Sequence, residues 1–159
     1  MKRLVGDVNL LKQILDAVAS GITVQDPDGK LVYVNPAATR FLNCDTPEEA
    51  LALGSEAIVK QFHFFDENGR PLSVKDLPGR RALKGEVEAA KIIGSTSAKT
   101  RGTLWSSVKA LPVKDASGQV ILAVNVFEDI TASKESEAKL RDANQRITDL
   151  LAKTLKVSR

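Results

Sequence analysis

Apolar and polar positions at the start of the chain predict a helix followed by a hairpin. Over residues 7–19, apolar side chains recur every three or four positions, and Asp7 can cap the first turn. Residues 22–25 and 31–34 read as strands, joined by Asp-Pro-Asp-Gly. This turn has a proline that presets its backbone and a glycine that accepts positive φ. We therefore expect a flanking helix within residues 1–20 and then two antiparallel strands.

Short helices are predicted for the middle of the chain. Asn35 and Thr46 each precede a proline, the order of a helix cap and a first helical residue. Residues 54–61 and 76–84 also read as short helices, while the apolar residues 62–65 are not counted among the strands. The sequence thus places a helical region between two groups of strands.

Three further strands are expected at residues 87–94, 103–112 and 119–127, the last two joined by a polar turn that ends in glycine. Five strands, grouped as two and three around a helical middle, indicate an α+β fold. Its antiparallel sheet carries the short helices on one face. The core is expected to span residues 21–130.

The pattern becomes helical from residue 131 to the end, which predicts a long C-terminal helix over residues 131–159. Its apolar positions form two imperfect series of seven-residue spacing, the pattern of a short coiled coil. The series are Leu140, Ile147, Thr154 and Ala143, Leu150, Val157.

Charge and composition exclude several classes. The formal net charge of +3 equals that of residues 131–159, which hold seven Lys/Arg and four Asp/Glu, so the remainder is balanced. No basic patch is interleaved with aromatics, so no nucleic-acid partner is expected. No apolar run approaches the ~20 residues of a membrane span. Cys44 is the single cysteine, which excludes an internal disulfide and suits a reducing, cytoplasmic setting.

Residues 21–38, with Trp105, the stretch 112–115 and the ending Asp129-Ile130-Thr131, resemble a PAS domain of bacterial multidomain sensors. Residues 64–72 and 77–83 resemble the subgroup that precedes GAF, serine-phosphatase or histidine-kinase domains. The resemblance covers about residues 8–135. It implies a cavity between the sheet and the short helices, which in this family holds a flavin, haem, metabolite or lipid, or is empty. It also implies dimerisation through the flanking helices.

Strand alternation and the family register together select the candidate cavity residues. They are Thr23, Gln25, Phe41, Ser106, Val108, Ala110, Ala123, Asn125 and Phe127. Asn125 has two interpretations, because a buried amide needs partners. It can bond to backbone or water, or it can contact the polar end of a ligand.

The opposite sheet face and the two flanking helices supply the candidate dimer interface. Its residues are Leu11, Ile14, Leu15, Val18, Ile22, Val24, Trp105, Leu140, Ile147 and Leu150. For Ile22, Val24 and Trp105, packing under the N-terminal helix of the same chain is the default interpretation, and contact with a partner subunit is its alternative. Asp129 and Thr131 are expected to tie the last strand to the long helix, where a signal would pass.

Cys44 and His63 are the candidate residues for attaching or ligating a cofactor. Cys44 lies too early for the flavin-reactive cysteine of the photoreceptor (LOV) branch, and Ser106 and Phe127 replace its flavin-binding Asn and Gln. His63 precedes the helix that carries the haem ligand in haem-binding relatives. A flavin–cysteine adduct, haem, a metal site and catalytic residues are therefore not expected, and the cofactor is left open.

The sequence thus favours a sensory module that binds a small ligand, forms a homodimer and relays a signal to an effector outside this chain. The alternative is a structural dimerisation module whose interior is filled. A packed interior would favour the second, and an open cavity near Ser106 and Asn125 the first.

Overall fold

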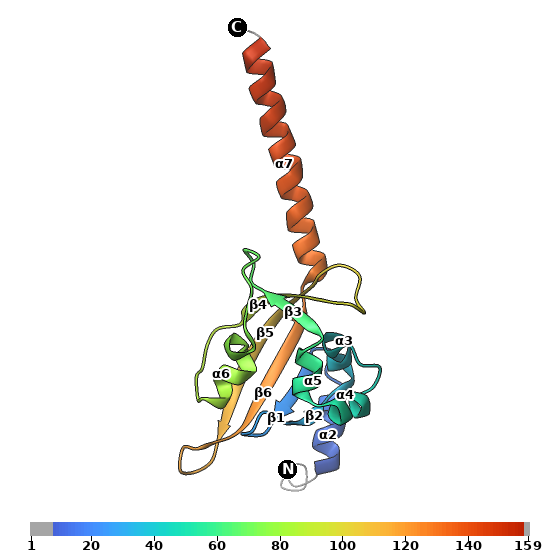
Figure 1. Ribbon diagram of the computed structural model, residues 1–159, viewed down its shortest axis with the longest axis vertical. Helices are drawn as coiled ribbons and strands as arrows, with labels where there is room; N and C mark the ends of the chain where they lie inside the picture. The colour runs from blue at the N-terminus through green and yellow to red at the C-terminus, as the bar shows by residue number, and fades with distance from the viewer. Residues whose placement is uncertain (1–7, 158–159) are drawn as a thin grey trace. The chain divides into compact units, whose positions relative to one another are not determined.

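The computed structural model describes residues 8–157 (Figure 1). The proposed helix cap Asp7 lies outside the described residues. The chain divides into two compact units, Met1–Asp129 and Ile130–Arg159.

The first unit is built on a six-stranded sheet in the order β2-β1-β6-β5-β4-β3. Each strand runs antiparallel to its neighbours. The strands are β1 Gly21–Gln25, β2 Leu31–Val34, β3 Phe62–Phe65, β4 Lys91–Ser97, β5 Leu104–Lys114 and β6 Val120–Asp129.

The predicted five strands are corrected to six, because β3 adds an edge strand beside β4. Phe62 is buried and His63 is exposed, so the segment does alternate. With only four residues, three of them aromatic, the alternation is too short to recognise in the sequence.

The β1–β2 hairpin closes with an aspartate that bonds to the turn backbone. The carboxylate Oδ1 of Asp26 accepts from the backbone N–H of Asp28 and Lys30, each at 3.0 Å. Gly29 takes a φ of 84°, which only glycine adopts easily. The same arrangement recurs at Asp66 and Asp115, so three turns share one mechanism.

The short helices gather over one face of the sheet (Figure 1). They are the 3-10 helix Pro36–Ala38, α3 Thr39–Leu42, α4 Pro47–Leu53, α5 Ser55–Val59, the 3-10 helix Val74–Asp76 and α6 Pro78–Leu83. Both predicted caps form: Asn35 Oδ1 accepts from the N–H of Ala38 at 3.0 Å, and Thr46 Oγ1 from that of Glu49 at 3.1 Å.

Helix α2 (Val8–Asp16) ends three residues before the predicted end at residue 19. The buried amide of Asn35 explains the early end, because its Nδ2 donates to the carbonyl oxygens of Leu15 and Ser20, at 3.2 and 2.9 Å. Tyr33 adds a second tie, donating its hydroxyl to Asp16 Oδ1 at 2.7 Å. Asn35 is therefore more than a helix cap, since it also holds the N-terminal segment to β2.

The second unit is the helix α7, Thr131–Val157, with 27 residues. None of its described residues is buried, and Leu140, Ile147 and Leu150 are all more than half exposed. Across residues 8–157, no helix is long and apolar enough to cross a membrane.

Candidate ligand cavity

A cavity of about 120 Å³ lies between the sheet and helices α3, α5 and α6. Strands β1, β4, β5 and β6 form its floor. Of the nine residues predicted to line it, seven do so. They are Thr23, Gln25, Phe41, Ser106, Val108, Asn125 and Phe127.

Ala110 and Ala123, the other two predicted residues, lie on the expected face but outside the cavity lining. Both are buried in a small apolar cluster with Ala82 of α6. Alternation gives the side of the sheet on which a residue lies. Alternation cannot show that α6 packs directly against these two alanines and so keeps them out of the cavity lining.

One end of the cavity is aromatic. The rings of Phe41 and Phe127 stack with their centroids 5.4 Å apart, and those of Phe62 and Phe64 with centroids 5.5 Å apart. Gly21 lies beside the first pair, where a Cβ would come within 3.0 Å of the Phe41 ring. These four residues are all but one of the chain's five phenylalanines. The sequence-based selection missed Phe62 and Phe64 because β3 itself was missed.

A row of polar side chains leads away from the aromatic end along β1. Asn125 on β6 is 5% exposed, and its Nδ2 donates to Thr23 Oγ1 at 3.2 Å. The next inward residue, Gln25, donates from Nε2 to the carbonyl of Gly29 at 3.3 Å. Gly79 of α6 packs against both amides: a Cβ there would lie 2.5 Å from Asn125 Oδ1 and 2.8 Å from Gln25 Oε1. Only glycine allows this approach.

The serine hydroxyls on the cavity floor are occupied within the sheet. Ser106 Oγ donates to the carbonyl of Ile93, and Ser95 Oγ to that of Leu104, both at 3.4 Å. Because each hydroxyl has a backbone partner, the two amides offer more polar capacity to a ligand than the serines do.

Arg80 stands where the polar row reaches α6, and sequence reasoning missed it. It is half-buried, lines the cavity, and places Nη1 2.5 Å from the position of a Cβ on Gly29. Among the described residues, no acidic side chain pairs with it. Its neighbour Arg81, by contrast, has Asp76, Glu86 and Glu88 within ion-pair distance. A run of two arginines gives no sign of which one will face a cavity.

The PAS_4 family model, described as a PAS fold, matches residues 15–135, about three quarters of the chain. The chain belongs to the PAS family. The comparison with curated proteins found no match.

Solved structures similar to this PAS domain share its fold at low sequence identity. A PAS domain from Colwellia psychrerythraea is 16% identical, with a TM-score of 0.52 over 79% of this chain and 98% of that one. A sensory box histidine kinase/response regulator from Burkholderia thailandensis is 15% identical, with a TM-score of 0.51 over 87% and 98%. An RNA-binding light-oxygen-voltage receptor is 19% identical, with a TM-score of 0.52 over 91% of this chain; the match spans 38% of that receptor.

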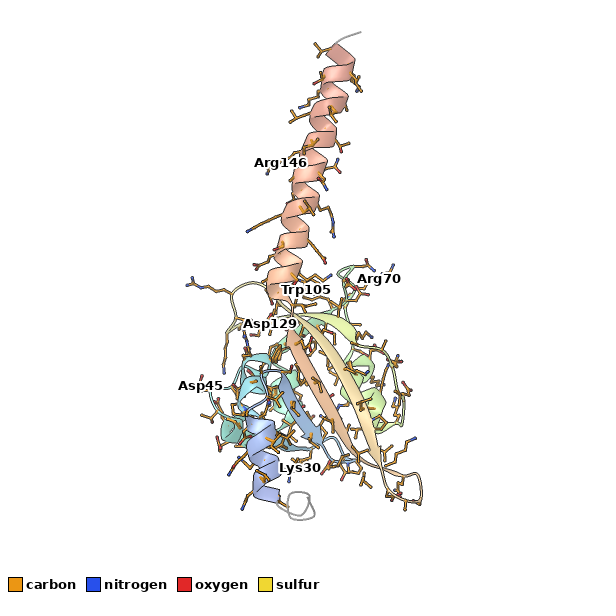
Figure 2. The ribbon with its side chains drawn as sticks, turned by 180° about the vertical axis from the view of Figure 1, so that it is seen from behind. Lys30, Asp45, Arg70, Trp105, Asp129 and Arg146 are labelled. Atoms are coloured by element: carbon orange, nitrogen blue, oxygen red, sulfur yellow. The ribbon has the colours of Figure 1, made fainter. Side chains whose placement is uncertain are left out.

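The exit of the PAS domain is marked by Asp129, the last residue of β6 (Figure 2). Its carboxylate lies 2.7 Å from Arg40 Nη2 of α3. The next residue, Phe41, lines the cavity and stacks on Phe127 of the same strand β6. Thr131, the other expected relay residue, begins α7.

Residues predicted for a dimer interface differ in how much surface they offer. Leu11, Ile14 and Val18 are exposed, whereas Leu15, Val24 and Trp105 are half-buried. Ile22 is 8% exposed, so it has little surface for a partner. Trp105 packs edge-on against Phe65 of β3, with ring centroids 5.4 Å apart. Packing within the chain thus occupies part of this face.

Cys44 and His63 lie outside the cavity lining. Cys44 is buried in the apolar cluster around Leu31 and Ile58, and burial raises the pKa of its thiol. His63 is exposed on β3. Among residues 8–157, no group of three or more His, Cys, Asp or Glu side chains could hold a metal ion.

Proposed function

We propose that this PAS domain is a sensory module, in which a small ligand bound in the cavity alters the end of β6 and the start of α7. The observation that carries the proposal is the cavity itself, with its aromatic end, its amide row and its lone arginine. A concave, mostly apolar space with a few convergent polar groups is the usual form of a small-molecule site.

The signal would leave the cavity through α3. Phe41 of α3 lines the cavity and also stacks on Phe127. A ligand that displaces the Phe41 ring would therefore also shift α3. The adjacent Arg40 holds Asp129 at the last residue of β6. A short helix that reaches both the ligand and the exit can couple them without a change in the rest of the sheet.

The second half of the proposal concerns α7, which we propose pairs with α7 of a second copy. Its exposed apolar residues recur at the heptad spacing of a two-stranded coiled coil. An isolated helix with so few heptads is marginal, so the exposed face of α2 would contribute to the homodimer. The effector would follow the C-terminal end of α7, outside this chain.

We propose a binding role, with no catalytic step. Among the described residues that line the cavity, none is Asp, Glu, His, Cys or Lys. General acid–base catalysis relies on such groups, and a serine or threonine nucleophile needs one of them beside it as a base. The proposal includes no nucleic-acid or membrane partner and places the domain in the cytoplasm, in keeping with its single, buried cysteine.

The deciding experiment is native mass spectrometry of the purified 159-residue chain, compared with its denatured mass. A dimer that carries extra small-molecule mass supports both parts of the proposal. A dimer without extra mass, which also fails to take up any small apolar compound, supports the alternative of a structural dimerisation module. A monomer under all conditions contradicts the relay through paired α7 helices.

The small volume of the cavity favours the alternative of a structural dimerisation module, because ligand pockets commonly span about 300–1,000 Å³. A cavity-filling variant separates the two functions. Val108→Phe would occupy the space that a ligand needs, and Val113→Phe, at a position on β5 outside the cavity lining, is its control. A sensor loses its ligand response with Val108→Phe alone, while a structural module dimerises as before with both variants.

A further inference from the structure

We propose that the cavity takes a small aromatic monocarboxylate, with its ring among the phenylalanines and its carboxylate on Arg80. The inference rests on the proposed function, because it names the class of ligand for that same site.

The charge of the ligand follows from Arg80. It is the one charged residue among the described residues that line the cavity, and none of them is acidic. Arg80 is half-buried and has no acidic partner among the described residues, and its planar guanidinium can bind a carboxylate through two parallel hydrogen bonds. Arg81, one residue on, is surrounded by three acids. The acidic groups near α6 thus pair with Arg81, and none of them pairs with Arg80.

The aromatic character of the ligand follows from the opposite end. Two stacked phenylalanine pairs, Phe41 with Phe127 and Phe62 with Phe64, line the same space. Aromatic rings prefer offset-stacked or edge-on partners at centroid distances of about 4.5–7 Å. A ligand ring inserted here would gain such contacts as well as apolar burial.

The size of the ligand follows from the volume. The cavity of about 120 Å³ is comparable with an engineered apolar cavity of about 150 Å³ that binds benzene. The volume therefore limits the ligand to about a single six-membered ring with one small substituent such as a carboxylate. Fused-ring cofactors are larger than this space.

The amides of Gln25 and Asn125 also line the cavity. They favour a ligand that carries a polar group where it passes them. Neither Gln25 Oε1 nor Asn125 Oδ1 accepts a hydrogen bond from a described residue, and Gly79 brings α6 close to both. Asn125 can present its oxygen or, after a half-turn, its NH₂ group, because the Thr23 hydroxyl can then donate to Oδ1. Gln25 keeps its present orientation, since a half-turn would place Oε1 against the carbonyl oxygen of Gly29. A carboxylate held by Arg80 can therefore receive an N–H from this side too.

The experiment uses the whole chain, with benzoate and benzamide as probes of nearly equal shape and different charge. Ligand-detected NMR titration gives the dissociation constant of each. We expect benzoate to bind at least tenfold more tightly than benzamide, because a hydrogen bond to a charged group outweighs a neutral one. In Arg80→Gln this preference should disappear while benzamide binding persists. Arg70→Gln, in the exposed turn after β3, is the matched control and should keep the preference (Figure 2).

Two other outcomes would overturn different claims. Equal binding of both probes, or a preference that survives Arg80→Gln, would contradict the assignment of a carboxylate to Arg80. Neither result would contradict the proposed sensor function. Failure of benzoate, benzamide and benzene alike to bind the wild-type chain overturns the assignment and the proposed ligand-binding function together. A folded Arg80→Gln variant, checked by its amide NMR spectrum, excludes unfolding as the cause of a lost preference.

Discussion

The guanidinium of Arg40 lies 2.7 Å from the carboxylate of Asp129 and so joins helix α3 to the last residue of β6. The Arg40 side chain is 64% exposed and that of Asp129 23%. An ion pair this exposed contributes at most about 1 kcal/mol to stability. Its position between the cavity helix and the exit of the domain therefore matters more for coupling than for folding.

Arg40→Gln should accordingly lower the free energy of unfolding by less than about 1 kcal/mol. It should also reduce the ligand-dependent change in hydrogen exchange over residues 126–131, because α3 would no longer hold the strand end. Denaturant titration and exchange mass spectrometry measure the two effects. Lys60→Gln, which removes an exposed ion pair to Glu56, is the control and should leave exchange at the exit unchanged. An unaltered response in Arg40→Gln would exclude this route.

Asn35→Ala should be among the most damaging polar substitutions in the chain. The fully buried Asn35 side chain accepts from the N–H groups of Ile22 and Ala38, at 2.7 and 3.0 Å. It also donates to the carbonyls of Leu15, near the end of α2, and Ser20, beyond that end. Leaving several of these buried groups without partners should cost about 3 kcal/mol or more. Thermal and denaturant unfolding test this. Asn68→Ala, in an exposed turn, should change stability by less than about 0.5 kcal/mol.

Gly79→Ala should destabilise the domain by about 1–3 kcal/mol, because the new Cβ would lie 2.5 Å from Asn125 Oδ1. The cause can be checked by a double-mutant cycle with Asn125→Ala, which removes the atom in conflict. The penalty for the alanine at position 79 should shrink in that background. A penalty of unchanged size would assign the strain to the second close contact of this Cβ, with Gln25 Oε1 at 2.8 Å, or to α6 itself.

Asp16→Asn should destabilise the domain at neutral pH and have little effect in acid. Hydrogen bonds from Lys12 and Tyr33 hold the pKa of the Asp16 carboxyl below its usual value. A carboxyl whose pKa is lowered by folding adds stability above the ordinary carboxyl range, and the contribution disappears as pH falls through the lowered value. The difference between wild type and variant should therefore shrink below about pH 4. Asp28→Asn, in the exposed first turn, is the control.

Leu150→Glu should convert the proposed homodimer to a monomer, because it places a charge in the apolar heptad series of α7. Sedimentation velocity at several concentrations measures the change. Arg141→Glu, at an exposed position on the face of the same helix away from the apolar series, also alters the charge and should leave the dimer intact. Retention of the dimer by Leu150→Glu would move the interface away from α7.

Local features of the fold could be predicted from the sequence because their causes are local. The three aspartate–glycine turns and the caps at Asn35 and Thr46 each depend on residues within four positions of one another. Alternation also placed Thr23 and Asn125 on the inner face of the sheet. These features need no knowledge of what packs above them.

The parts that the sequence could not predict depend on distant packing. Ala110 and Ala123 were assigned to the cavity because nothing in β5 or β6 reveals that α6 covers them. Arg80 was not predicted to line the cavity, because its orientation depends on where α6 docks and on the acids that surround Arg81. A single sequence shows which residues share a face, and the packing of the helices decides which of them meet empty space.

The pairing of β1 with β6 also determines when this fold can form. Thr23 and Asn125 are adjacent in the sheet but 102 positions apart in the chain. At a synthesis rate of about 5–20 residues per second, the first hairpin would wait roughly 5–20 seconds for its central neighbour to be made. Until then β1 has one free edge and the cavity lacks the part of its floor that β6 supplies. A nascent chain released before residue 125 would therefore be a target for chaperones and proteases, and ligand could be bound only once synthesis of the core was complete.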